Sequence, residues 1–97
     1  MPRTLTRYRN TTARTTPDGV AVTLHNTDIF RLSDDGQTVT LDSGGWETVT
    51  TKRRMNECAD YFGLGFRVHQ QDFEWTVTTP DGRVLPFADG MTFAARA

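Results

Sequence analysis

Short runs in which apolar and polar residues alternate make up most of the chain from residue 20 onward. The first run contains Val20, Val22 and Leu24, separated by Ala21 and Thr23. Later runs of the same kind are Phe30 to Leu32, Val39 to Leu41, Phe66 to Val68, Phe73 to Val77 and Val84 to Phe87, with a further candidate at 91–93. A period of two residues is typical of half-buried β-strands. The pattern therefore predicts a protein built mainly from short strands.

Asp-Gly pairs punctuate these runs and predict how the strands are connected. They occur at Asp18-Gly19, Asp35-Gly36, Asp81-Gly82 and Asp89-Gly90. Glycine adopts the positive φ angle that tight turns require, and aspartate accepts hydrogen bonds from the turn backbone. The three runs between residues 20 and 41 are therefore predicted to form a three-stranded antiparallel meander.

One segment has the period of a helix. Around a helical wheel, one apolar face collects Thr51, Met55, Cys58, Ala59 and Phe62. Thr48 or Thr50 is suited to cap its start, and Gly63 to end it. The predicted fold is an α+β domain over residues 17–97, a small antiparallel sheet with one packed helix in the order β-β-β-α-β-β-β.

The first sixteen residues differ from the rest of the chain. They contain four arginines and no acidic residue, and Leu5 and Tyr8 are their only large apolar residues. Residues 1–16 are therefore expected to form a frayed or edge-strand arm. The alternative is a basic arm that contacts an acidic partner or phosphates.

Length and charge limit the classes of function. The 97 residues suffice for one domain, and the net charge of −1 disfavours nucleic-acid binding through bulk charge. The single cysteine permits no intrachain disulfide. No apolar run approaches the roughly 18 residues that cross a bilayer, and no secretory signal is present. The expected location is the cytoplasm of the cell that makes the protein.

The sequence offers little support for catalysis. His25 and His69 lie in different predicted elements, and neither has a partner at a spacing typical of a metal site. Cys58 falls on the apolar helix face, where cysteine is usually inert. The acidic residues cluster in turns. We therefore expect no enzyme activity, no metal and no cofactor.

The transition from the glycine turn to the helix is the main candidate site. Three consecutive cations, Lys52 to Arg54, are predicted in the first helical turn, where each costs about 0.3–1 kcal/mol against the helix dipole unless an anion is nearby. In the structural interpretation, Trp46 closes the end of the core and the arginines pair with acids such as Glu47 or Glu57. In the functional interpretation, the segment binds a partner or an anion through Ser43, Gly44, Gly45, Trp46, Thr51, Lys52, Arg53, Arg54 and Asn56.

The remaining aromatic residues are predicted to belong to the core. They are Phe66, Phe73, Trp75, Phe87 and Phe93, which follow the strand alternation. Aromatic stacking on single-stranded nucleic acid is the alternative. Trp46 lies beside two glycines and is the aromatic residue expected to be partly exposed.

Several blocks of the chain resemble small, mostly uncharacterised accessory proteins encoded by bacterial viruses. The resemblance covers roughly residues 20–93 and lies in His25 to Thr27, Ser43 to Trp46, Thr50 to Asn56, Phe62 to Phe66, Asp72 to Trp75 and Phe87 to Met91. It implies a viral accessory protein that acts in the infected bacterial cell. It supplies no activity and no catalytic residue.

Three functions remain as hypotheses. The first is a non-catalytic module that binds a host or antiviral-defence protein, an anti-CRISPR type of role included, and inhibits it. The second is a nucleotide or nucleic-acid binder, in which Gly44, Gly45, Thr51 and Lys52 hold a phosphate. The third is a minor structural component of the virion. The sequence leaves the oligomeric state open.

Overall fold

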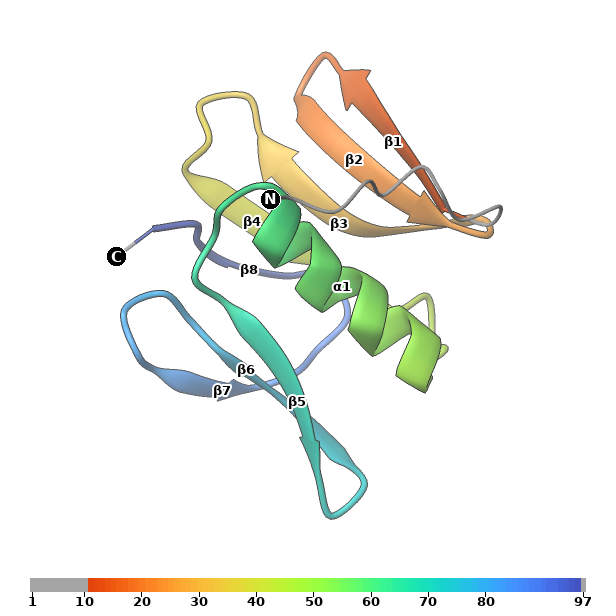
Figure 1. Ribbon diagram of the computed structural model, residues 1–97, viewed down its shortest axis with the longest axis vertical. Helices are drawn as coiled ribbons and strands as arrows, with labels where there is room; N and C mark the ends of the chain where they lie inside the picture. Colours follow the sequence, from red (N-terminus) through yellow and green to blue (C-terminus); the bar gives the residue numbers. More distant parts are fainter. Residues whose placement is uncertain (1–10, 97) are drawn as a thin grey trace.

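The protein is an α+β domain with one helix and two antiparallel sheets, as seen in a computed structural model that describes residues 11–96 (Figure 1). The strands before the helix are β1 (Thr11–Thr16), β2 (Gly19–Leu24), β3 (Thr27–Ser33) and β4 (Thr38–Leu41). The helix α1 spans Val49–Tyr61. The strands after it are β5 (Arg67–Gln71), β6 (Glu74–Thr78), β7 (Val84–Pro86) and β8 (Met91–Ala94).

The predicted α+β class, the meander of β2, β3 and β4 and the candidate strand at 91–93 are confirmed, and the structure places a further strand, β1, before the meander. β1 pairs with β2 from Thr11 opposite Leu24 to Thr16 opposite Gly19, so residues 11–16 form an edge strand. β8 pairs with β4, which closes a five-stranded sheet in the order β1-β2-β3-β4-β8. The observed order is therefore four strands, one helix and four strands. The basic residues at positions 1–10 of the predicted arm lie outside the described residues.

The single sheet of the prediction is replaced by two. β5, β6 and β7 form a separate three-stranded sheet, and Figure 1 shows α1 in front, between this sheet and the larger one. The core lies behind the helix and is built around Phe30, whose ring stacks on Phe62 and Phe66 at centroid distances of 5.3 and 6.1 Å. Phe66 in turn meets Phe93 edge-on at 5.3 Å. These rings connect the helix end with both sheets.

A β-bulge explains why two successive residues of β3 are both buried. The register changes between Val22 and Thr23, which leaves Ile29 as an additional residue between the pairs of β2 and β3. Ile29 is 1% exposed and Phe30 is fully buried. An extra residue in one strand breaks the alternation of faces, and so both side chains enter the core.

Both predicted ends of the helix are confirmed. The Thr48 hydroxyl accepts a hydrogen bond from the Thr51 N–H at 3.1 Å, which makes Thr48 the N-cap. At the other end Gly63 has a φ of +68°, and Leu64 N–H donates to the Ala59 carbonyl at 2.7 Å. This is the Schellman arrangement that glycine favours. Because the helix begins at Val49, the three cations occupy its fourth to sixth positions. Their predicted placement in the first turn is wrong, and the opposing effect of the dipole is correspondingly weaker.

Candidate functional site

The candidate site is a groove of about 510 Å³ beside the amino-terminal end of α1. The β2–β3 turn forms one wall through His25, Asn26 and Thr27, and the residues that precede α1 form the other. The lining residues are Leu24, His25, Asn26, Thr27, Ile29, Ser43, Trp46, Thr48, Thr50 and Thr51. Seven of these ten residues have polar side chains, and Leu24, Ile29 and Trp46 are the apolar ones.

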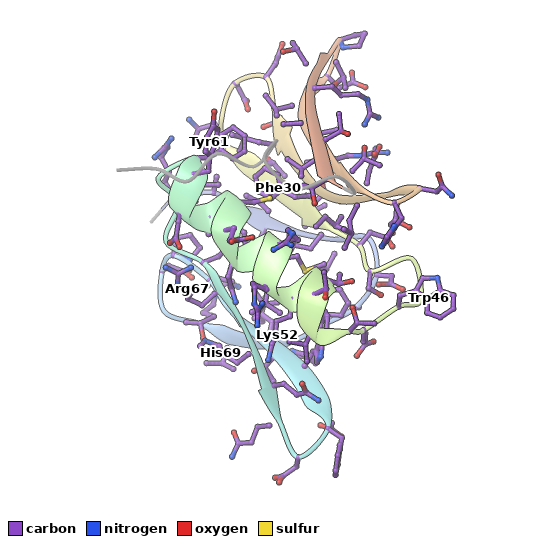
Figure 2. All side chains as sticks on the ribbon, turned by 45° about the vertical axis from the view of Figure 1, so that its right-hand side comes forward. Phe30, Trp46, Lys52, Tyr61, Arg67 and His69 are labelled. Atoms are coloured by element: carbon purple, nitrogen blue, oxygen red, sulfur yellow. The ribbon has the colours of Figure 1, made fainter. Side chains whose placement is uncertain are left out.

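Trp46 is the most exposed aromatic residue of the groove. Its side chain is 70% exposed and projects from the edge of the molecule, whereas Phe30 lies beneath α1 (Figure 2). The expected exposure of Trp46 is confirmed, and its alternative role as a plug of the core is wrong. A large, exposed aromatic side chain on a fixed backbone is typical of a contact surface.

The turn that presents Trp46 is held by two carboxylates. The Asp89 carboxylate accepts hydrogen bonds from the Ser43 N–H at 2.8 Å and from the Ser43 hydroxyl at 2.7 Å. The Asp42 carboxylate accepts one from the Gly44 N–H at 2.7 Å. Partial burial raises the pKa of Asp89, but hydrogen bonds from Ser43 and from the Gly45 N–H outweigh this effect and lower the pKa overall. The turn is therefore rigid and carries its own anions.

This arrangement contradicts the predicted phosphate cradle. The backbone N–H groups that were expected to meet a phosphate donate instead to Asp42 and Asp89. The Thr51 N–H is likewise taken up by the N-cap Thr48. A phosphate at Gly44 and Gly45 would lie next to two carboxylates, which repel it.

Gly44 is required by the groove as well as by the turn. Its φ is +64°, and a side chain at this position would collide with the side chain of Thr27 in the opposite wall. Gly45 has a φ of +85°, but a side chain there would meet nothing within 4 Å. The close contact between the two walls therefore requires glycine at position 44 but not at position 45.

Two of the predicted contact residues on the helix serve the fold. Arg54 is 8% exposed and forms an ion pair of 2.8 Å with Glu57, which is 5% exposed. The structural interpretation is confirmed for Arg54, which pairs with Glu57 because residue 54 lies on the packed side of α1, and Arg54 is therefore not exposed as a contact residue. Asn56 is hydrogen-bonded to the backbone of Val68 in β5.

Lys52 and Arg53 are the cations that remain on the outer surface of α1. Lys52 is half-buried and Arg53 is exposed, and within residues 11–96 neither side chain forms an ion pair. Together with Val49 and Asp60 they line a shallow hollow of about 450 Å³. Val49 is itself 59% exposed. This surface lies next to the turn that carries Trp46.

The sequence pattern missed three groove residues and one exposed aromatic residue. His25, Asn26 and Thr27 are not among the predicted site residues, yet they form a wall of the groove. Phe73, predicted as a core residue, is 94% exposed at the tip of the β5–β6 hairpin. Its φ is +69°, a conformation that costs of order 1–3 kcal/mol in a residue other than glycine. The other four aromatic residues of that prediction lie in or against the core.

Cys58 is the one cysteine of the chain and lies inside the core. Cys58 is fully buried, and burial raises the pKa of its thiol because the thiolate would lose its hydration. Within residues 11–96 no three His, Cys, Asp or Glu residues are placed to hold a metal ion. The one helix in this part of the chain is too short and too polar to cross a membrane.

Comparison with known sequences shows that the chain belongs to the Kyanoviridae Gp96 protein family, whose sequence model matches residues 3–94. The match covers nearly the whole chain and makes this a cyanophage-encoded protein. The resemblance to small proteins of bacterial viruses is thereby confirmed. No curated protein and no solved structure gave a significant match.

Proposed function

We propose that this phage protein is a non-catalytic binding module that attaches to a protein of the infected cell through the surface around Trp46. The observation that carries the proposal is the 70% exposure of Trp46 on a turn held by Asp42 and Asp89. Tryptophan is among the residues that most often dominate binding energy in protein interfaces. A rigid turn also reduces the conformational entropy that is lost on binding.

The charge beside Trp46 supports a partner with an acidic surface. Lys52 and Arg53 lie on the outer face of α1 and form no ion pair within residues 11–96. Complementary charge at the rim of an interface accelerates association and helps to select the partner. The proposed partner surface therefore has an apolar pocket for Trp46 and carboxylates beside it.

Inhibition of the partner is part of the proposal. A non-catalytic binding module acts on its partner by obstructing the surface that it covers. A host or antiviral-defence protein is inhibited when the covered surface is its active site or an assembly interface.

Phosphate binding has less support than protein binding. The hydrogen bonds from the turn to Asp42 and Asp89 leave the expected cradle occupied by the protein's own carboxylates. A role as a virion component has no specific observation in its favour.

The test is affinity capture of the tagged protein from infected cyanobacterial cells, with retained proteins quantified by mass spectrometry. We expect Trp46→Ala to reduce retention of the partner at least tenfold, and Arg53→Glu to reduce it several-fold. Tyr61→Ala is the matched control, because Tyr61 is 41% exposed at the opposite end of α1 (Figure 2). If every protein retained by the wild type is also retained by Trp46→Ala, the proposal is wrong.

A further inference from the structure

The far half of the β5–β6 hairpin projects from the molecule. Every residue from His69 to Glu74 is exposed, and Figure 1 shows the hairpin extending beyond the helix and the other strands. Gln71 pairs with Glu74, so Asp72 and Phe73 alone form the turn. At 94% exposure, the ring of Phe73 makes almost no contact with its own protein.

Phe73 in this turn departs from the Asp-Gly pattern of the four other turns. The glycines of all four Asp-Gly turns have positive φ angles. In the hairpin, Asp72 has a φ of +51° and Phe73 a φ of +69°. A two-residue turn with both φ angles positive favours Asp-Gly, so phenylalanine stands where folding favours glycine. Backbone strain of this kind is concentrated at functional sites.

The base of the hairpin is firmly held, so Phe73 is presented by a rigid support. Trp75 follows two residues later, is 5% exposed and packs edge-on against Phe87 at 5.2 Å. Val77 of β6 is fully buried. On the other strand, Val68 is 2% exposed and is hydrogen-bonded to Asn56 of α1. An aromatic residue on a pre-organised support loses little conformational entropy when it binds.

The charges beside Phe73 identify the chemistry of the surface that it fits. Asp72 and Glu74 precede and follow Phe73 in the chain, and both are exposed. Carboxylates repel the phosphates of nucleic acids and of anionic membranes. They attract lysine and arginine, and an apolar ring between two carboxylates complements an apolar pocket with a basic rim.

We propose that the tip of the β5–β6 hairpin is a second contact site, at which Phe73 enters an apolar pocket with a lysine- or arginine-rich rim on a protein partner. The inference rests on the proposed function in that the protein acts by binding another protein. It adds a contact that is separate from Trp46 and names the chemistry of the partner surface. Asp72 and Glu74 orient the ring by pairing with the rim.

The test places the photocrosslinking amino acid p-benzoylphenylalanine at position 73 of the full-length tagged protein in infected cells. The control carries it at position 84, because Val84 is a 64% exposed residue of the same sheet, at the end away from the tip. We expect a protein crosslink at position 73 and none of the same mass at position 84. The crosslinked peptide should map to an apolar pocket with lysine or arginine at its rim.

Capture with substituted proteins completes the test. We expect Phe73→Gly and Phe73→Ala each to reduce retention of the crosslinked protein at least tenfold, whereas Val84→Ala leaves retention unchanged. Asp72→Asn with Glu74→Gln should reduce it at least threefold and weaken its dependence on salt. A crosslink to lipid or nucleic acid, a pocket without basic residues, or no crosslink at all would overturn the inference.

The same variants separate this inference from the proposed function. Retention that survives Phe73→Gly but is lost with Trp46→Ala rejects the hairpin contact and leaves the Trp46 surface standing. Retention that survives Trp46→Ala but is lost with Phe73→Gly supports the hairpin contact and rejects the Trp46 surface.

Discussion

The side-chain amide of Asn56 in α1 forms hydrogen bonds with both backbone groups of Val68 in β5. Its Nδ2 donates to the Val68 carbonyl at 3.0 Å, and its Oδ1 accepts from the Val68 N–H at 2.8 Å. The amide thus takes the place of a neighbouring strand at the edge of the smaller sheet. This contact fixes the helix against the base of the hairpin that carries Phe73.

Replacing Asn56 should destabilise the protein more than its half-buried position suggests. Asn56→Ala leaves the N–H and the carbonyl of the buried Val68 without their partner, and each such group costs about 1–3 kcal/mol. We expect a loss of about 2–4 kcal/mol in the free energy of unfolding, measured by urea denaturation. The exposed Arg53→Ala is the control and should change stability by less than about 0.5 kcal/mol. Equal effects of the two substitutions would contradict the structural role of Asn56.

Alanine at the two glycines of the Trp46 turn should have unequal effects. Gly45→Ala should lower the free energy of unfolding by about 1 kcal/mol, because alanine is strained at a positive φ but its side chain enters open space. Gly44→Ala has the same backbone strain and in addition collides with Thr27, so we expect a loss about 1–2 kcal/mol larger. Thermal unfolding measures both. Thr27→Ala should recover part of the difference in the Gly44→Ala background, and no recovery would argue against the contact.

Glycine in place of Phe73 should stabilise the fold while removing the exposed ring. Phe73→Gly relieves the strain of a φ of +69°, and we expect a gain of about 1 kcal/mol, or roughly 4–8 °C in Tm. Phe73→Ala removes the same ring without relieving the backbone and should leave Tm nearly unchanged. A loss of stability with Phe73→Gly would show that the ring serves folding.

The stability of the protein should depend strongly on both residues of the buried Arg54–Glu57 ion pair. Arg54→Met breaks the buried ion pair with Glu57, and breaking such a pair by removing one partner costs about 3–5 kcal/mol. Replacing both residues, as Arg54→Met with Glu57→Leu, removes the charge as well as its partner. The double variant should therefore be more stable than Arg54→Met alone, as measured in urea. Additive losses would indicate that the two residues act independently.

The stability of the folded protein should fall in acid, in part because Asp28 becomes protonated. Hydrogen bonds from the Arg14 guanidinium and the Thr23 hydroxyl hold the pKa of Asp28 well below its usual range, although burial opposes them, and Arg31 adds a further bond. An aspartate of the unfolded chain titrates near pH 3.9, so the stabilisation is complete above this value and is lost as the pH falls below it toward the folded pKa.

We expect Asp28→Asn to be less stable than the wild type near neutral pH and to lose less stability between roughly pH 5 and pH 2. Unfolding free energies across this range provide the measurement. Asp18→Asn, in the exposed β1–β2 turn, is the control and should follow the wild type. If the unfolding free energies of Asp28→Asn and of the wild type change with pH in parallel, Asp28 does not contribute to the loss of stability in acid.

The local pattern of the sequence was sufficient to predict the fold class and most elements. Alternation of apolar residues identified β2 to β7 and gave β8 as a candidate, because one face of each strand is buried. Thr48 and Gly63 marked the ends of α1, since capping depends on neighbouring residues only. The exposure of Trp46 also followed from its place beside two glycines.

Relationships between distant segments were decided by the tertiary structure alone. Asp89 holds Ser43 across 46 positions of the chain, so the sequence could not show that the glycine turn already contains an anion. The role of Arg54 stayed open and Phe73 was misassigned for the same reason: local pattern cannot tell which side of a helix faces a second sheet, or that an alternating run begins in a turn. Pairing between elements depends on packing in three dimensions, and packing determined which cations and aromatic residues remain exposed.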